Sequence, residues 1–211
     1  MKRGDPVAQE HQSHWDEVHD KDATQLSWYQ THAAVSLELI SALGVPLDAA
    51  VIDVGGGTSS LVDGLVAGGF TDVSVLDVSP PAIEVARHRL GPAARDVRWL
   101  HEDLLTWEPT RLYGLWHDRA VFHFLVDPAD QTHYRRLLGR ALAPGAALVI
   151  ATFAAGGPTW CSGLSVARYE PEDLLTVLGG DLQLVATRRE EHTTPTGAVQ
   201  PFTWLAARKA P

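Results

Sequence analysis

The 211-residue sequence contains a single cysteine, Cys161. One cysteine excludes an internal disulfide and argues against a small secreted scaffold held together by such bridges. The polar start Met1–Pro6 has no apolar signal core, and no apolar run in the sequence is long enough to span a bilayer. These absences predict a soluble protein of the reducing cytoplasm that does not enter the membrane.

Dense basic runs are also missing. The 17 Lys and Arg residues are scattered among 26 acids, which gives a formal net charge of −9 at pH 7. Because nucleic-acid affinity depends chiefly on neutralising phosphates with Lys and Arg, this charge argues against nucleic acid as a partner. With 45% apolar residues and no internal repeat, the chain is expected to fold as one large domain.

Short β-branched runs alternate with helix-period segments from Val51 onward, which is the pattern of parallel strands joined by crossover helices. The sequence therefore predicts an α/β fold, a Rossmann-like doubly wound sheet of seven mostly parallel strands with helices on both faces. A turn-rich connection at 193–197 predicts an antiparallel C-terminal hairpin. The expected strands are 51–54, 73–77, 97–100, 113–117, 147–153, 182–190 and 199–208, and the expected helices are 34–43, 59–67, 81–90, 131–142 and 171–178.

Residues 1–45 are expected to form a helical cap or lid on the core, and residues 46–211 to form the main domain. The stretch 11–29 is polar with isolated aromatics, which predicts a segment that packs late or orders on ligand. Its histidines suggest a metal site, but His14 and His19 are five residues apart and no acid–histidine cluster recurs downstream. A solvated helix face is therefore favoured, and no metal is predicted.

Gly55, Gly56 and Gly57 follow the first expected strand, where a tight turn brings backbone close to a ligand at the carboxyl edge of the sheet. The second strand ends at Asp77, whose carboxylate offers only acceptors and can bind the two hydroxyls of a ribose. Two nucleoside cofactors compete for this pattern. A dinucleotide such as NAD also uses Gly-x-Gly-x-x-Gly with an acid about 20 residues later.

Two residues separate these cofactors. Ser60 stands at the third glycine position of the dinucleotide pattern. Asp53 precedes the turn, where it would repel a pyrophosphate but suit a cofactor that carries an ammonium group. S-adenosylmethionine (SAM) has an ammonium group and no phosphate, so the residues favour SAM over NAD.

The turn and its surroundings resemble a known enzyme family. The segment 53–58, Asp-Val-Gly-Gly-Gly-Thr, is similar to the first motif of class I SAM-dependent methyltransferases, and the similarity runs from about residue 51 to residue 153. The resemblance implies SAM as cofactor and S-adenosylhomocysteine (SAH) as product. It also implies that Asp77, with Val78 beside it, binds the ribose, that Asp103 contacts the adenine amino group, and that Leu104 flanks the adenine ring.

The segment 115–125 resembles the fourth motif of these enzymes, where the chain leaves strand four beside the methionine part of the cofactor. The resemblance places Asp118 and His123 near the reacting methyl group. A structural cap, or pairing with Arg119, is an equally good interpretation of Asp118. His123 is the candidate general base, because a neutral imidazole can remove a proton near pH 7, and the alternative for it is a structural histidine.

Four residues are candidates for the acceptor pocket. Trp28 and Tyr29 are expected to form an aromatic lid, because aromatic faces hold both a sulfonium and a flat substrate; the alternative is that they pack the cap onto the core. Trp160 and Cys161 lie in a small-residue loop after strand five and are expected to line the pocket. For Cys161, a buried inert thiol is favoured over a ligand for a soft acceptor.

The acceptor is only partly predicted. The segment 27–29 is similar to small bacterial methyltransferases related to thiopurine- and thiol-methylating enzymes, and also to some protein-lysine methyltransferases. The Asn-Pro-Pro-Tyr tetrapeptide of enzymes that methylate DNA bases and glutamine is absent, and no recognition domain is inserted. We therefore expect methyl transfer to an O, S or N nucleophile of a small molecule. The alternatives are a protein-lysine methyltransferase, a non-catalytic SAM-binding protein and an NAD-dependent oxidoreductase.

Overall fold

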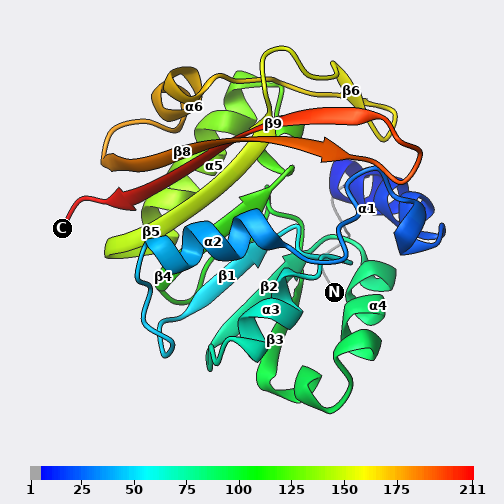
Figure 1. Ribbon diagram of the computed structural model, residues 1–211, viewed down its shortest axis with the longest axis horizontal. Helices are drawn as coiled ribbons and strands as arrows, with labels where there is room; N and C mark the ends of the chain where they lie inside the picture. Colours follow the sequence, from blue (N-terminus) through cyan, green and yellow to red (C-terminus); the bar gives the residue numbers. More distant parts are fainter. Residues whose placement is uncertain (1–5) are drawn as a thin grey trace.

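The computed structural model describes residues 6–211, so the first five residues of the expected cap lie outside it. A seven-stranded sheet in the order β3-β2-β1-β4-β5-β9-β8 forms the centre of the fold (Figure 1). Strands β1 to β5 are parallel, and β9 runs antiparallel to both β5 and β8. The predicted fold class is confirmed. The strands are β1 (Val51–Val54), β2 (Val73–Asp77), β3 (Val97–His101), β4 (Tyr113–Arg119), β5 (Leu142–Phe153), β8 (Leu182–Thr193) and β9 (Val199–Lys209).

Two helices begin directly after residues whose side chains cap them, Ser79 and Asp127. Pro stands in the first turn of four of the helices, where its missing N–H costs nothing. Helix α5 starts three residues before the predicted position, because the Asp127 side chain caps it by accepting the Ala129 N–H at 2.7 Å. The helices are α1 (Pro6–His19), α2 (Ala34–Ala42), α3 (Leu61–Ala67), α4 (Pro80–Leu90), α5 (Pro128–Ala141) and α6 (Pro171–Leu178), with short 3₁₀ turns η1 (Ala23–Gln25), η2 (Gly91–Asp96) and η3 (Phe122–Phe124).

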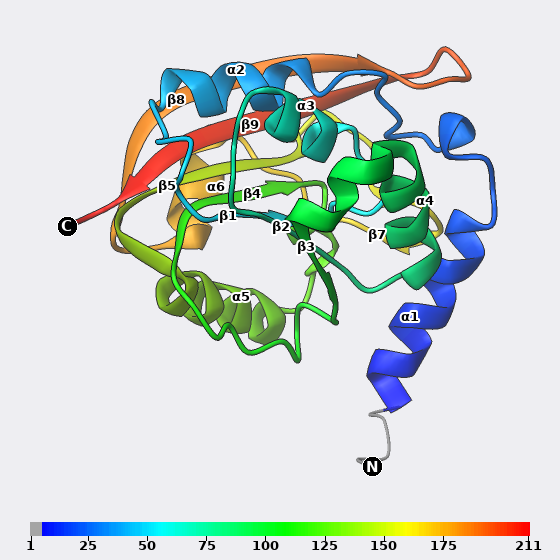
Figure 2. The same ribbon diagram turned by 90° about the horizontal axis from the view of Figure 1, so that it is seen from below.

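Two apolar layers cover the two faces of the sheet. Helices α2 and α3 pack against one face through Leu39, Ile40 and Leu65, whereas α5 and α6 pack against the other through Leu137 and Leu174. Figure 2 shows the sheet with α2 and α3 on one side and α5 on the other. Successive residues of a strand point to opposite faces, so the inner strands β1 and β2 are buried on both sides and are mostly apolar in sequence, whereas the edge strand β3 is partly exposed.

Helix α1 lies at the carboxyl end of the parallel strands, beside α4 (Figure 2). Its Asp16 carboxylate accepts a hydrogen bond from Ser79 Oγ at 2.7 Å, and Ser79 caps α4. The first part of the expected cap is thus a helix, α1, held against the carboxyl end of the parallel strands.

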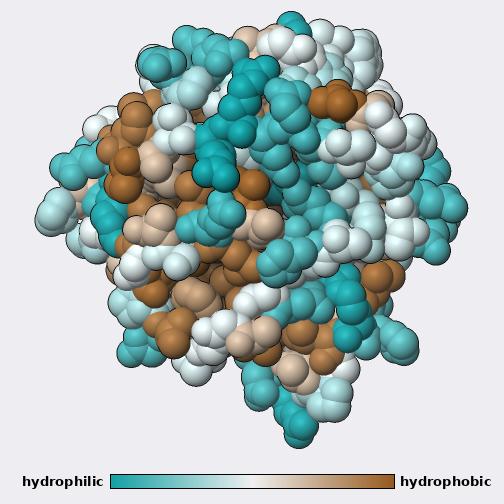
Figure 3. Space-filling view, viewed as in Figure 1, coloured by the Kyte–Doolittle hydropathy of each residue, from teal (hydrophilic) through white to brown (hydrophobic). Residues whose placement is uncertain are grey.

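The loop after β5 contains a small hairpin, β6 (Trp160–Cys161) and β7 (Leu164–Ser165), that the sequence did not predict. Strand β8 forms one edge of the large sheet, and exposed Leu184 and Val185 lie on it. Figure 3 shows the molecule from the same side as Figure 1, and apolar residues gather there over α2 and the start of β8. Within residues 6–211, no helix is both long and apolar enough to cross a membrane.

Candidate active site

The glycine turn after β1 leaves no room for side chains. Gly55 has φ +63° and donates its N–H to Leu76 O at 2.7 Å, which ties the turn to the end of β2. A Cβ atom on Gly55 would lie 2.1 Å from Val121 Cγ2, and one on Gly57 would lie 2.6 Å from Asp77 Oδ2. The turn is thus a backbone cradle between β1, β2 and the loop that follows β4.

A cavity of about 510 Å³ opens over this cradle, at the carboxyl ends of the parallel strands. This is where ligands bind in open α/β sheets, and the volume lies within the usual range for ligand sites. Its lining includes most of the residues predicted from the sequence: Trp28, Asp53, Gly55, Gly57, Asp77, Val78, Asp103, Leu104 and Cys161. The lining does not include Gly56, Tyr29, Asp118, His123 or Trp160.

Asp77 is a buried carboxyl at the end of β2. It accepts a hydrogen bond from the Ser79 N–H at 2.8 Å, but little water reaches it. Burial raises the pKa of Asp77 to about 7, and the nearby negative charge of Asp53 adds to this effect. Hydroxyl groups of a ligand would therefore stabilise the charged form of Asp77, because they would donate the hydrogen bonds that water does not supply.

Asp53 lies in the middle of the same cavity wall. Its Oδ1 atom is 2.7 Å from His117 Nδ1, while its Oδ2 atom is buried and has no hydrogen-bond partner among the described residues. A buried carboxylate oxygen without a partner is costly unless a ligand supplies a donor. Asp53 is thus suited to bind a cationic or N–H group.

Asp103 lies across the cavity, in the loop after β3. Its Oδ1 accepts the Leu105 N–H at 2.8 Å, and its Oδ2 is 3.3 Å from Nδ1 of His11 on α1. Leu104 beside it is buried and presents an apolar wall. Together they offer one acceptor and one flat apolar surface, which suits a heteroaromatic ring with an amino group.

Comparisons with known proteins agree with this geometry. Residues 51–145 match the family model described as a methyltransferase domain. The chain is also 25% identical over 189 residues to thiocyanate methyltransferase 1 of Arabidopsis thaliana, covering 86% of this chain and 78% of the relative. The corresponding protein of Brassica oleracea is 28% identical over 159 residues, which cover 72% of this chain and 67% of that protein.

Residues 51–145 form a SAM-dependent methyltransferase domain. Solved structures share its fold: a SAM-dependent methyltransferase of Anabaena variabilis has a TM-score of 0.74 at 17% identity and covers 99% of this chain and 97% of its own. The 1,6-didemethyltoxoflavin-N1-methyltransferase of Burkholderia thailandensis has a TM-score of 0.70 at 19% identity, covers 100% of this chain and 93% of its own, and was solved with SAH.

The residues of this methyltransferase fit SAM. The lining combines the unpartnered Asp53 Oδ2, the buried carboxyl of Asp77 and a glycine cradle that a Cβ atom would fill. Two carboxyls this close to the turn would repel a pyrophosphate, but they match an ammonium group and ribose hydroxyls. Asp53 would hold the ammonium, Asp77 the ribose, and Asp103 with Leu104 the adenine.

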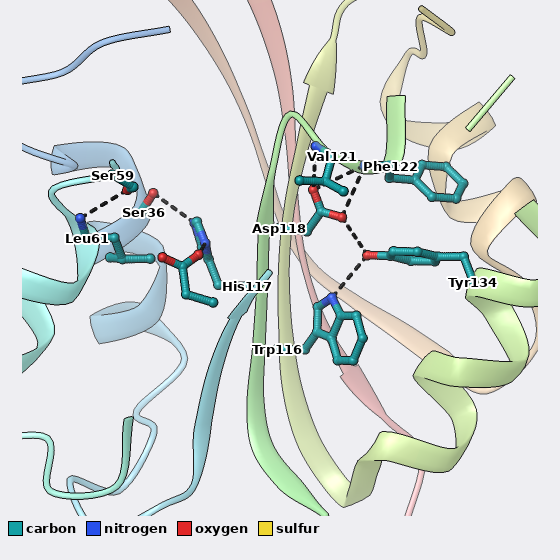
Figure 4. Close-up of polar contacts among 10 residues, drawn as sticks. Ser36, Ser59, Leu61, Trp116, His117, Asp118, Val121, Phe122 and Tyr134 are labelled. Carbon is teal, nitrogen blue, oxygen red and sulfur yellow. Dashed lines mark hydrogen bonds and ion pairs between the residues drawn. The ribbon is translucent and has the colours of Figure 1, made fainter. Parts of the chain in front are cut away.

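The structure corrects the prediction for Asp118. Figure 4 shows His117 and Asp118, neighbours on β4, pointing to opposite sides of the sheet. Asp118 accepts hydrogen bonds from the Val121 N–H at 3.0 Å and from the Tyr134 hydroxyl at 2.8 Å, and it is fully buried away from the cavity. Burial raises the pKa of Asp118 to about 6. Its place is that of a structural cap for the loop after β4.

The structure also argues against His123 as the base. Its ring packs between Phe124 and Phe153, with centroid distances of 4.5 and 4.8 Å, and neither ring nitrogen has a partner among the described residues. Burial lowers the pKa of His123 to about 3, and the charge of Arg119 lowers it further. His123 lies outside the cavity lining, where it is not placed to take a proton from an acceptor held in the cavity.

Two of the four candidate acceptor residues line the cavity, and two do not. Trp28 and Cys161 line the cavity, and burial raises the pKa of the Cys161 thiol, which keeps it protonated. Tyr29 does not line the cavity, and Trp160 is 62% exposed on the β6–β7 hairpin. Gly56 is a packing position, because a Cβ atom there would lie 2.6 Å from Asp53 Oδ2.

Sequence reasoning missed one face of α1. His11, Trp15 and His19 are four residues apart and line the cavity together, as does His14. Trp15 packs edge-on against Trp28 and Phe124, with centroid distances of 6.2 and 5.0 Å. The four-residue spacing of the ring side chains was the available signal. Among the described residues, no group of three or more His, Cys, Asp or Glu side chains is arranged to hold a metal ion.

Arg119 and His117 were missed as well. Both line the cavity from β4, directly beside the Asp118 that the motif resemblance singled out. The available signal was the two-residue period of a strand. It places His117 and Arg119 on one face and Asp118 on the other.

Proposed function

We propose that this methyltransferase transfers the SAM methyl group to a small, soft anion, with sulfur or a halide as the attacking atom. The observation that carries the proposal is Arg119. Arg119 lines the cavity, and its Nε and Nη2 atoms are buried and have no hydrogen-bond partner among the described residues. Burial lowers the pKa of Arg119 to about 10, so the guanidinium remains charged at neutral pH.

No carboxylate among the described residues forms a salt bridge with this charge. Glu190 acts on Arg119 through space, but its two oxygens accept hydrogen bonds from Gln30 Nε2 and Trp204 Nε1. Arg119 itself donates to Trp28 O at 3.0 Å and lies 4.7 Å from the centre of the Phe202 ring. A buried cation with two unused donors is a binding site for an anion.

The rest of the wall favours a soft anion of small size. Trp15, Trp28 and Phe124 give polarisable aromatic surface, and the cavity of about 510 Å³ must hold cofactor and acceptor together. The Arabidopsis and Brassica relatives are named thiocyanate methyltransferases, and thiocyanate is an anion of this kind.

The charges also balance. When bound, SAM supplies a methyl group on a positively charged sulfur, and transfer to an anion yields SAH and a neutral methylated acceptor with no proton to remove. Arg119 would hold the anion in line, and positioning of this kind can supply much of the rate. A general base is then unnecessary, which agrees with the burial of His123 outside the cavity.

The proposal keeps three further predictions from the sequence. The described part of the predicted cap, residues 6–45, acts as a lid packed on the core. The acceptor is a small molecule and not a nucleic acid, in line with the net charge of −9. The single free cysteine suits an enzyme of the cytoplasm.

Transfer of labelled methyl from SAM tests the acceptor class. Thiocyanate, iodide, hydrosulfide and an aromatic thiolate would be compared with neutral phenols, amines and lysine-rich proteins. We expect turnover with the anions, and a loss of roughly 30-fold or more in kcat/KM for them in Arg119→Met, with partial recovery in Arg119→Lys. Arg136→Met removes an exposed Arg far from the cavity lining and is the matched control. Preference for amines or labelling of lysine in proteins would refute the proposal.

A further inference from the structure

A chain of three buried polar groups connects α2 to the cofactor site. His117 Nδ1 lies 2.7 Å from Asp53 Oδ1, and His117 Nε2 lies 3.0 Å from Ser36 Oγ. The three residues are at most 2% exposed. Figure 4 shows His117 directed toward Ser36, on the side of the sheet opposite Asp118.

Burying these three hydrogen-bonded polar groups costs more free energy than filling the same space with apolar side chains. Their surroundings are apolar, with Leu115 on the same strand as His117 and Val149 and Ala151 on the neighbouring strand β5. An apolar side chain at position 117 would fill this layer without desolvating an imidazole, a carboxylate and a hydroxyl. The arrangement therefore calls for a role at the site.

Strand register shows what His117 does to Asp53. In the parallel pair β1–β4 the two residues are direct partners, while Asp53 faces Val75 on its other side. His117 supplies the one side-chain hydrogen bond that Asp53 makes among the described residues. Because His117 engages Oδ1, the carboxylate cannot rotate freely. Asp53 lines the cavity, and its Oδ2 remains buried without a partner among the described residues.

We propose that His117 is a positioning residue that holds Asp53 with Oδ2 directed to the amino group of the cofactor, and that Ser36 fixes the imidazole from behind. The inference rests on SAM as the cofactor and not on the identity of the acceptor. It assigns to the β4 histidine a part in selecting the amino-acid portion of SAM, distinct from the binding of its nucleoside portion.

Two ligands separate this role from a structural one. SAH carries the amino-acid portion, whereas 5′-methylthioadenosine has the same adenosine and thioether without it. In calorimetry, we expect His117→Phe to weaken SAH binding about tenfold and to leave 5′-methylthioadenosine within about twofold, since the ammonium contact is a charge-assisted hydrogen bond. His117→Asn carries an N–H donor near the position of Nδ1 and should recover most of the SAH affinity. Ser36→Ala should cost less than about threefold.

Equal weakening of both ligands by His117→Phe, or of neither, would overturn the assignment. If the wild-type protein bound neither ligand, the cofactor itself would be wrong, which is a different outcome. Should His117→Phe fail to fold, the wild-type protein labelled with ¹⁵N-histidine serves instead. SAH should shift the His117 ring signals and 5′-methylthioadenosine should not, and an equal response to both ligands would contradict the proposal.

Discussion

Replacing Asp77 with Asn should stabilise the ligand-free protein and weaken cofactor binding at the same time. The pKa of Asp77 is raised by burial from its ordinary value near 3.8 to about 7. Between these two values the folded protein binds a proton that the unfolded chain does not, so the free energy of unfolding falls as the pH rises from about 4 to about 7. Above this range the whole penalty of the buried charge is present.

The size of the penalty follows from the shift. Each pKa unit corresponds to about 1.4 kcal/mol, so the shift of about three units sets a ceiling of about 4 kcal/mol. Asn loses an acceptor oxygen at a cost of about 1–2 kcal/mol, which leaves a net gain of about 2 kcal/mol at pH 8. For a chain of 211 residues this raises Tm by roughly 4–8 °C.

Thermal unfolding of wild type and Asp77→Asn without ligand, at about pH 5 and about pH 8, measures the effect. The difference in Tm should be present at pH 8 and nearly absent at pH 5, where wild-type Asp77 is protonated. SAH affinity at pH 8 should fall by roughly 1–3 kcal/mol, because the ribose loses charge-assisted bonds. Glu102→Gln, an exposed acid at the same cavity, is the matched control with little change in Tm. A lower Tm for Asp77→Asn at pH 8, or unchanged SAH affinity, would refute the reasoning.

Two further predictions concern the residues that the structure moves away from the chemistry. Asp118→Ala leaves the buried Val121 N–H and Tyr134 hydroxyl without an acceptor, so it should lower the free energy of unfolding by about 3–5 kcal/mol. The SAH affinity of the folded protein should change by less than about threefold. Loss of SAH binding at an unchanged Tm would show instead that Asp118 belongs to the cofactor site. His123→Leu should leave kcat within about threefold of wild type. Because the pKa of His123 is lowered to about 3, its contribution to stability is lost as the pH falls from about 6.5 toward 3, and the variant should flatten this acid limb. A large drop in kcat would make His123 the base after all.

The centre of the sheet could be predicted from the sequence because its inner strands are buried on both faces. Val51–Val54 and Val73–Asp77 are mostly apolar runs, the first followed by a glycine turn and the second ending in an acid, and the structure has them with the same bounds. The start of β5 was placed too late, because Pro144 and Gly145 signal a turn, while the structure keeps them within a strand whose pairing with β4 shifts register.

Three residues of the cavity lining were predictable for the same reason, since Asp53 lies in β1, Asp77 ends β2 and Asp103 comes shortly after β3. The acceptor end was not. A motif resemblance indicates that 115–125 lies near the cofactor, but only the alternation of β4 decides that Arg119 faces the cavity and Asp118 does not. Helix α1 lacks an apolar stripe, because its aromatic face covers a cavity instead of a packed core.

Diffraction from crystals grown with SAH and iodide tests the central claim most directly, since iodide is a soft anion with a strong anomalous signal. We predict an anomalous peak in the cavity within hydrogen-bond distance of Arg119 Nε or Nη2, beside Trp28 and Phe124, and no such peak in Arg119→Met. A cavity that binds SAH but shows no iodide at Arg119 would contradict the proposed acceptor class.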